Sequence, residues 1–284
     1  MPGPIRNVSD TALWVAMYRA LESERRDALF SDPFARRLAG ARGEQILDSL
    51  PRGRAMGWPM VVRTAVMDEL VLRCAGDGCT AVLNLAAGLC TRAYRLPLPG
   101  SLQWFDADLP DMIDYKRTLL AAERPRCRYE ALAVDLREPA ARQALFARVG
   151  ALGGPALAVA EGLLIYLADE DVQALGRELH AAASFRWLLC DLASPPLLKM
   201  LARTWGRRLA EGNAPLRFAP AAGTAFFAPL GWREAEFRST WDEARRLRRT
   251  MRGAWLWNLL GRLMPEKKRE RFRRFSGSVL FERA

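Results

Sequence analysis

The chain has 284 residues, half of them hydrophobic, and its 43 Lys and Arg outnumber its 32 Asp and Glu to give a formal net charge of +11. Its apolar residues come in short runs, none near the roughly 18 residues needed to cross a bilayer. The opening stretch MPGPIRNVSDTALW lacks the features of a secretory signal. These properties argue against a membrane-spanning or secreted protein, and we expect a cytoplasmic protein with a sizeable core.

Five scattered cysteines form no C-x-x-C pair, and the chain has a single histidine, His180. A disulfide framework and a zinc site are both disfavoured, and we expect no metal cofactor. His180 lies near the end of a predicted helix, where a cationic side chain suits the helix dipole.

The excess positive charge gathers late, in EARRLRRTMRGAW and PEKKRERFRRF. A basic surface favours anionic ligands, but no zinc-finger or RRM motif accompanies it, so we expect no nucleic-acid partner. The segment MRGAWLWNLLGRLM places four apolar residues on one helical face, which is typical of a face packed on a core. A lid over an apolar acceptor and a membrane-surface helix are the alternatives. The four residues are Met251, Trp255, Leu259 and Leu263.

Apolar residues at helical spacing dominate the first 77 residues. Ser9 or Asp10 is a suitable N-cap for a first helix, and Asp32 for a second one with Pro33 at its first position and Gly40 at its end. The predicted helices cover residues 9–24, 31–40 and 60–76.

From residue 81, short apolar runs typical of strands alternate with helical segments, which indicates a parallel sheet covered by helices. We therefore predict an α/β fold: one Rossmann-like domain of parallel strands with an antiparallel C-terminal strand. Its parts are a helical cap (1–77), a Rossmann-like core (78–241), a basic helical insertion (242–275) and a terminal strand (276–284). The predicted strands are 81–85, 102–108, 129–135, 156–160, 186–191, 232–239 and 277–284, and the core helices are 110–123, 139–149 and 169–183.

Successive predicted strands end in small residues or acids, at the sheet edge where parallel sheets bind ligands. In strand order these ends are Ala86-Ala87-Gly88, Asp106 with Asp108, Asp135-Leu136, and Glu161-Gly162. Each end alone is a weak signal, because Asp also caps helices. Together they indicate one adenosine-type ligand laid across the edge.

The small-residue corner lets the backbone come close to a ligand. Asp108 follows Gly88 by 20 residues, the spacing at which an acid accepts both ribose hydroxyls. Asp135 can accept from an exocyclic amine while Leu136 covers an adenine face. A dinucleotide site requires more glycines than LAAGLCT supplies, and the acids would repel phosphate. A cationic adenosyl compound, S-adenosyl-L-methionine, fits better.

The stretches LNLAAGLCTRAYRL, WFDADLPDMIDYK, AVDL and AEGLLIYL resemble successive motifs of the leucine carboxyl methyltransferase-like (PPM) family. The opening TALWVAMYRALESERRDALFSDPFARRLAG is similar to the family's first helices, so the resemblance spans residues 9 to 170. It implies a class I fold and an O-methyltransferase that uses S-adenosyl-L-methionine.

The resemblance also implies roles at matching positions. Asp108 would bind the ribose, Asp135 and Leu136 the adenine, Glu161 the methionine end, and Arg63 the cofactor carboxylate, while Gly88 would shape the first turn.

Two residues depart from the family pattern. Ala86 stands where the family has a glycine, and a backbone contact there survives only if its φ is negative. Cys90 replaces the aspartate of the D-T-R motif, which removes a charge and a strong acceptor. The alternative interpretation is therefore a catalytically degenerate module of the same fold that binds a cofactor or a partner.

Methyl transfer from a sulfonium depends mainly on alignment, and a carboxylate acceptor is already ionised at pH 7. We expect a small acid or natural product as acceptor, or a protein C-terminus, with membrane contact a lesser alternative. Tyr166 and Asp191 follow the fourth and fifth strands and are candidate acceptor contacts. Solvated surface charge is the simpler role for three basic residues that could also attract an anion: Arg92, Arg95 and Lys116.

Two other enzyme classes fit less well. A nicotinamide-dependent oxidoreductase would need the missing glycines. A nucleic-acid methyltransferase usually has a proline-rich motif after the fourth strand, and AEGLLIYL is not one.

Overall fold

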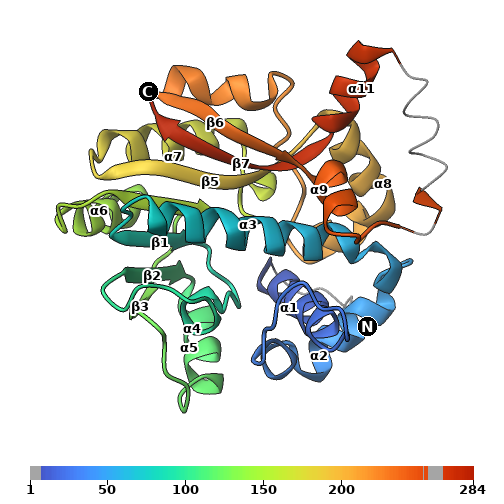
Figure 1. Cartoon of the computed structure of the whole chain (residues 1–284), viewed down its shortest axis with the longest axis horizontal. Coiled ribbons are helices and arrows are strands. Elements are labelled where there is room, and N and C mark those ends of the chain that lie inside the picture. The colour runs from blue at the N-terminus through green and yellow to red at the C-terminus, as the bar shows by residue number, and fades with distance from the viewer. Residues whose placement is uncertain (1–7, 252, 255–264) are drawn as a thin grey trace.

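A seven-stranded sheet forms the centre of the computed structural model, which describes residues 8–251, 253–254 and 265–284. The strand order is β3-β2-β1-β4-β5-β7-β6 (Figure 1). The first five strands pair in parallel, and β7 is antiparallel to both β5 and β6. The predicted sheet with one antiparallel C-terminal strand is confirmed. The strands are β1 (Ala81–Leu85), β2 (Gln103–Asp108), β3 (Arg128–Ala133), β4 (Ala156–Ala160), β5 (Phe185–Ala193), β6 (Trp232–Ser239) and β7 (Ser276–Arg283).

Helices cover both faces of the sheet. One face packs on α6 (Pro139–Gly150), α7 (Asp169–Ala181) and the 3-10 segment η3 (Gly223–Leu230). The other face packs on α3 (Trp58–Gly76), α4 (Arg92–Arg95) and α9 (Thr240–Arg246), and Figure 1 shows α3 running along it. Both faces of the central strands are therefore buried, as continuous apolar runs such as AVLNL and ALAVA require.

A third apolar cluster joins the N-terminal helices to the rest of the chain. It is formed by α1 (Val8–Ser23), α2 (Ala35–Ser49) and α8 (Pro195–Glu211), with Met112 of α5 (Pro110–Leu119). Trp14 of α1 meets Trp205 of α8 edge to face, with ring centroids 5.2 Å apart. The expected helical cap thus packs partly on α8, a helix that the sequence analysis did not predict.

The remaining described elements are short. They are η1 (Arg54–Met56), η2 (Leu164–Tyr166) and α11 (Glu266–Arg273). Along the chain, α9 and α11 both come after β6 and before β7. Of the predicted apolar stripe in this region, Trp255, Leu259 and Leu263 lie outside the described residues. No described helix combines the length and apolar character needed to span a bilayer.

Several predicted helix ends were wrong. Ser9 and Asp10 lie inside α1 instead of capping it, and Asp10 pairs with Arg42 of α2. Asp32 and Pro33 precede α2, whose N-cap is Phe34. Gly40 takes a positive φ of 56° and kinks α2, which then continues to Ser49. Asp10 forms a tertiary ion pair with Arg42 instead of capping α1. Asp32 does both: its Oδ2 pairs with Arg19 at 2.8 Å, and its Oδ1 accepts from the N–H of Phe34 at 3.2 Å.

The expected place of His180 at the end of a helix is confirmed, but its surroundings disfavour the cationic form. His180 lies in the last turn of α7. Burial, together with the charge of Arg283, lowers the pKa of its imidazole, so the neutral ring is favoured. The ring packs edge to face on Trp232, with centroids 5.8 Å apart.

Candidate active site

One large cavity of about 1670 Å³ lies at the carboxyl ends of the strands, between the sheet edge and the helices α1, α3 and α8. Drug-sized ligands occupy pockets of roughly 300–1,000 Å³, so this volume accommodates a cofactor together with an acceptor. Nine residues expected from sequence to contact cofactor or acceptor line it, whereas Asp106 does not: Arg63, Ala86, Gly88, Asp108, Asp135, Leu136, Glu161, Tyr166 and Asp191.

The turn after β1 bends sharply at two residues. Ala86 has φ 48° and Gly88 has φ 50°, both in the left-handed region. Between them, the N–H of Ala87 donates to the carbonyl of Ala107 at 3.1 Å, which ties the turn to β2. Glycine adopts this backbone without cost, whereas alanine is strained by roughly 1–2 kcal/mol. The positive φ at Ala86 is the case for which the sequence analysis expected the backbone contact to fail.

Asp108, the last residue of β2, is held by two backbone groups. Its Oδ2 accepts from the N–H of Gly88 at 2.6 Å, and its Oδ1 accepts from the N–H of Leu109 at 2.7 Å. Burial raises the pKa of this carboxyl, while the two N–H donors act against the rise. Each carboxylate oxygen keeps a lone pair for a further donor, which is what a ribose diol requires.

Asp106 does not belong to the ligand edge, contrary to the sequence expectation. Its carboxylate is buried and accepts from Lys116 Nζ at 2.6 Å, Asn84 Nδ2 at 2.8 Å and Trp104 Nε1 at 2.8 Å. The solvated role expected for Lys116 was therefore wrong as well.

Asp135 and Leu136 follow β3 at the far side of the cavity. Asp135 Oδ1 accepts from the backbone N–H of Arg137 at 3.0 Å, and the Arg137 guanidinium pairs with its Oδ2 at 2.6 Å. Hydrogen bonds from Arg137 lower the pKa of Asp135, so this carboxyl is ionised at neutral pH. The Leu136 side chain is partly buried on the core and also faces the cavity.

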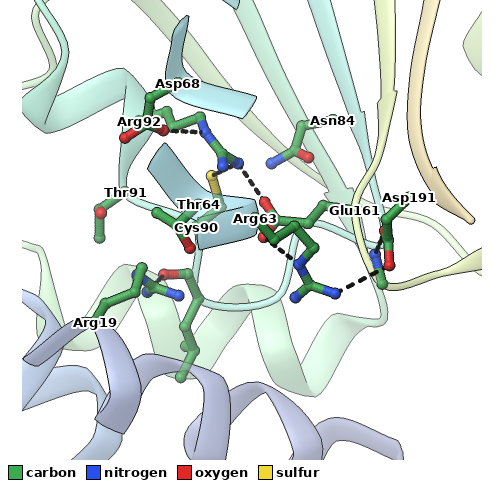
Figure 2. Close-up of polar contacts among 12 residues, drawn as sticks. Arg19, Arg63, Thr64, Asp68, Asn84, Cys90, Thr91, Arg92, Glu161 and Asp191 are labelled. Atoms are coloured by element: carbon green, nitrogen blue, oxygen red, sulfur yellow. Dashed lines mark hydrogen bonds and ion pairs between the residues drawn. The ribbon is translucent and has the colours of Figure 1, made fainter. Parts of the chain in front are cut away.

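A chain of ion pairs crosses the cavity from α3 to β5 (Figure 2). Arg63 donates from Nε to Glu161 Oε1 at 3.0 Å and from Nη1 to Asp191 Oδ2 at 3.1 Å. The second oxygen of Glu161 accepts from Arg92 Nη1 at 2.5 Å. Burial of Glu161 favours its neutral form, but the charges of Arg92 and Arg63 prevail and lower its pKa to about 2.

Asp191 also belongs to this network. The sequence suggested it as an acceptor contact but did not predict its pairing with Arg63. Its Oδ1 accepts from the N–H of Gly162 at 2.6 Å, so it holds both Arg63 and the turn after β4. Arg63 Nη2 has no hydrogen-bond partner among the described residues, which leaves one guanidinium nitrogen for a ligand carboxylate.

The surface role expected for Arg92 and Arg95 was wrong. Both are buried and both pair with Asp68 of α3, Arg92 from Nε at 2.7 Å and Arg95 from Nη1 at 2.6 Å. Cys90 Sγ lies 3.5 Å from Arg92 Nη1. Asp68 is a positioning residue that the sequence analysis missed, although a carboxylate inside an apolar helical run is the available signal.

Tyr166 lies at the end of η2 and packs partly buried on the cluster of α1, α2 and α8. Burial raises the pKa of its hydroxyl, and Arg63 and Asp191 are near enough to act on it. Tyr166 therefore stands between the ion-pair chain and the apolar part of the cavity.

S-adenosyl-L-methionine fits the charges of this cavity. Asp108 and Asp135 lie on the β2–β3 side, where hydroxyl and amine donors need acceptors, and Arg63 lies on the β4–β5 side, where a carboxylate needs a donor. No cluster of three or more His, Cys, Asp or Glu suited to a metal ion occurs within the described part of the chain.

A family model for leucine carboxyl methyltransferase matches residues 12–180, more than half of the chain. The chain belongs to the leucine carboxyl methyltransferase family. The match covers the cap and the sheet edge through α7, which together carry all the proposed cofactor contacts.

Related sequences are named as candidate S-adenosyl-L-methionine-dependent methyltransferases. One from Parafrankia sp. is 38% identical over 82% of this chain and 79% of its own length. One from Streptomyces coelicolor is 38% identical over 58% of this chain, and one from Mycobacterium tuberculosis is 38% identical over 63%. The matched part of the chain spans 62% and 64% of the length of the latter two relatives. The names agree with the expected cofactor.

Solved structures share the fold. A Thermobifida fusca structure titled as a candidate methyltransferase has a TM-score of 0.60 at 15% identity, covering 99% of this chain and 96% of its own. A Streptomyces avermitilis protein of the DUF574 family has a TM-score of 0.59 at 14% identity, covering 95% and 97%. These likenesses confirm the Rossmann-like methyltransferase architecture.

Proposed function

We propose that this chain is an S-adenosyl-L-methionine-dependent O-methyltransferase that methylates the carboxylate of a small acid or natural product. The observation that carries the proposal is the convergence of Arg63, Asp108, Asp135 and Glu161 on one cavity, in a chain of this family. The residues come from four different elements, and few other ligands would use two acids on one side and an arginine on the other.

The proposed binding roles are those that the family resemblance implies, and the geometry supports them. Asp108, fixed by two backbone N–H groups, accepts the ribose hydroxyls. Asp135 and Leu136 hold the adenine edge and face. Arg63 binds the cofactor carboxylate through its remaining donors, while Glu161, ionised and fixed by two arginines, accepts from the cofactor ammonium.

The cofactor supplies an electrophilic methyl group on a sulfonium. Transfer of that methyl group to the acceptor oxygen would leave the electron pair of the broken carbon–sulfur bond on sulfur. A carboxylate of ordinary pKa is ionised at pH 7 and gives up no proton in this step. The protein's contribution is alignment and exclusion of water, for which the ion-pair chain and the partly buried Tyr166 are suited.

The first test is cofactor binding by isothermal titration calorimetry. Asp108→Asn should weaken S-adenosyl-L-methionine by about tenfold or more, because the ribose loses a charged acceptor. Asp114→Asn is the matched control, since Asp114 is an exposed aspartate on α5 outside the cavity, and its affinity should equal wild type. Absence of binding to the wild-type chain would refute the cofactor assignment.

The second test is turnover with a methyl-labelled cofactor and a panel of carboxylic acids. A methyl ester releases its label in alkali, so label that survives alkali treatment rules out carboxylate methylation.

The second candidate function is a cofactor-binding or partner-binding module without turnover. The strained Ala86 and the loss of the family aspartate at Cys90 favour it. Tight cofactor binding without label transfer to any acceptor in the panel would decide for it.

A further inference from the structure

Eight arginines line the cavity, and two of them differ from the other six in having no carboxylate partner among the described residues. The six each pair with a carboxylate of this chain: Arg19, Arg63, Arg92, Arg95, Arg137 and Arg142. Arg52 and Arg217 have no carboxylate partner among the described residues, and both are exposed. An arginine facing a binding cavity without an internal counter-ion is available to an anionic ligand.

Arg217 lies beside the reacting end of the cavity. Its backbone N–H donates to the carbonyl of Ile165 at 2.7 Å, and Ile165 belongs to η2 together with Tyr166. Tyr166 in turn lies near Arg63 and Asp191. The segment carrying Arg217 is thereby fixed next to the residues proposed to hold the methionine end of the cofactor.

An apolar wall adjoins Arg217. Its five residues are partly buried, pack on the cluster of α1, α2 and α8, and line the cavity: Met56, Met60, Tyr166, Leu201 and Leu216. Leu216 precedes Arg217 in sequence. At the other end, the N–H of Met56 donates to the carbonyl of Arg52 at 3.0 Å, so the second unpaired arginine also borders the wall.

The cavity therefore has two chemically different sides. Asp108, Asp111 and Asp135 face it from β2, α5 and the end of β3. The apolar wall and Arg217 face it from η1, α3, η2, α8 and the loop after α8. The first side suits the adenosine part of a cationic cofactor, and the second suits a ligand with an apolar body and a negative group.

Resting on the proposed function, we propose that Arg217 binds the carboxylate of the methyl acceptor and that the apolar wall binds its hydrocarbon body. The acceptor is then an amphipathic acid, not a small polar one. Arg217 selects the anion through charge-assisted hydrogen bonds and places one carboxylate oxygen toward the methyl group, and the wall selects acids with a long apolar chain.

The test uses the full chain saturated with S-adenosylhomocysteine and three probes: decanoate, decanamide and butanoate. Calorimetry should give decanoate an affinity at least about tenfold higher than decanamide, which lacks the charge, and than butanoate, which lacks most of the chain. Arg217→Gln should remove the preference for decanoate over decanamide. Leu201→Ala should weaken decanoate and decanamide to the same extent.

The matched control is Arg203→Gln, because Arg203 is an exposed arginine of α8 that does not line the cavity and pairs with no carboxylate in the described part of the chain. It should leave all three affinities unchanged. Retention of the decanoate preference in Arg217→Gln would overturn the role of Arg217, and equal affinities for decanoate and butanoate would overturn the role of the wall.

Two further arms identify the source of the carboxylate and separate this inference from the proposed function. An apolar hexapeptide with a free C-terminus, compared with its C-terminal amide, reports whether a chain terminus binds as decanoate does. A titration with S-adenosyl-L-methionine is done independently. Loss of cofactor binding refutes the proposed function, whereas intact cofactor binding with no acid preference refutes only the acceptor site.

Discussion

Glu161 owes its charge to two arginines on opposite sides of its carboxylate. Arg63 and Arg92 lower its pKa from the ordinary 4.5 to about 2 in spite of its burial. A carboxyl with a depressed native pKa contributes stability above its unfolded pKa, and that contribution disappears as the pH falls through the native pKa. The contribution of Glu161 to the free energy of unfolding therefore begins to decrease below about pH 4.5.

Glu161→Gln should lower the free energy of unfolding at pH 7 by about 2 kcal/mol, because two buried guanidinium groups lose a counter-ion. Since Arg63 retains Asp191 and Arg92 retains Asp68, the loss stays below that of a fully orphaned charge. Urea unfolding between pH 7 and 3 checks the sign: the gap from wild type should narrow as the pH falls below 4.5. A gap that widens there would contradict the assignment.

Ala86 offers a direct measurement of strain at the cofactor turn. Ala86→Gly should stabilise the chain by about 0.5–1 kcal/mol, the left-handed strain relieved less the backbone entropy of glycine. Ala87→Gly is the control: the neighbouring alanine has no positive φ, so its replacement should destabilise. Equal effects of the two changes in urea unfolding would show that the turn at Ala86 is unstrained.

The place of a residue in the fold was predicted well where it depends on local sequence, and poorly where it depends on a distant partner. Asp108 and Glu161 follow directly from strand ends. Arg92 is buried because Asp68 and Glu161 reach it from 24 and 69 residues away, and Lys116 is buried because of Asp106. A single sequence does not reveal such long-range ion pairs, so an arginine is expected by default to be solvated.

The turn from β4 into η2 is the element that couples the sheet to Arg63. Gly162 has φ 67° there, and a Cβ at this position would lie 3.2 Å from Arg63 Nη1. Its backbone N–H also holds Asp191. This one turn therefore fixes both partners of the ion pair.

Gly162→Ala should cost about 1–2 kcal/mol of stability and also weaken S-adenosyl-L-methionine severalfold, because the methyl group displaces the Arg63 guanidinium. Gly153→Ala is the matched control. Gly153 has φ 77° with open space around a Cβ, so it should lose stability without losing cofactor affinity. Calorimetry and urea unfolding on both variants measure the two effects separately.

Strands were easier to predict than helix boundaries. The five parallel strands alternate with helices, and β1 and β4 are continuous apolar runs. All seven strands, β6 and β7 included, lie where expected within one or two residues. Helix α8 was missed although its signal is present: Ser194-Pro195-Pro196 precedes apolar residues at helical spacing. Asp10 does not cap α1 because it pairs with Arg42, whereas Asp32 lies just before α2 and combines an ion pair to Arg19 with a hydrogen bond from the N–H of Phe34.

At the scale of the whole molecule, the cavity exists because the cap and α8 close over the sheet edge. A ligand that binds only this closed arrangement stabilises it by mass action. S-adenosylhomocysteine at 100 times its Kd should add about 2.7 kcal/mol and raise the Tm by about 5–10 °C. Asp108→Asn, with an affinity about tenfold lower, should retain about half of this stabilisation, about 1.4 kcal/mol, at the same ligand concentration. A full rise in that variant would place the ligand elsewhere.

That the strand-end residues would meet at one edge was predictable from the fold. The apolar wall on the acceptor side of the cavity was not. Strand order in a parallel sheet brings the ends of β1, β2 and β4 to one edge whatever the side chains. The apolar wall combines η1, α3, η2, α8 and the loop after it, and nothing in the periodicity of one segment says which others it will meet.

The place of β7 between β5 and β6 has a consequence for biosynthesis. β6 contacts the sheet only through β7, which is the later of the two to leave the ribosome. The strands that carry Asp108 and Glu161 can assemble while translation continues, yet β6 has no edge to join until residues 276–283 emerge. A ribosome stalled before those residues would hold a nascent chain with its ligand edge formed and its sheet two strands short.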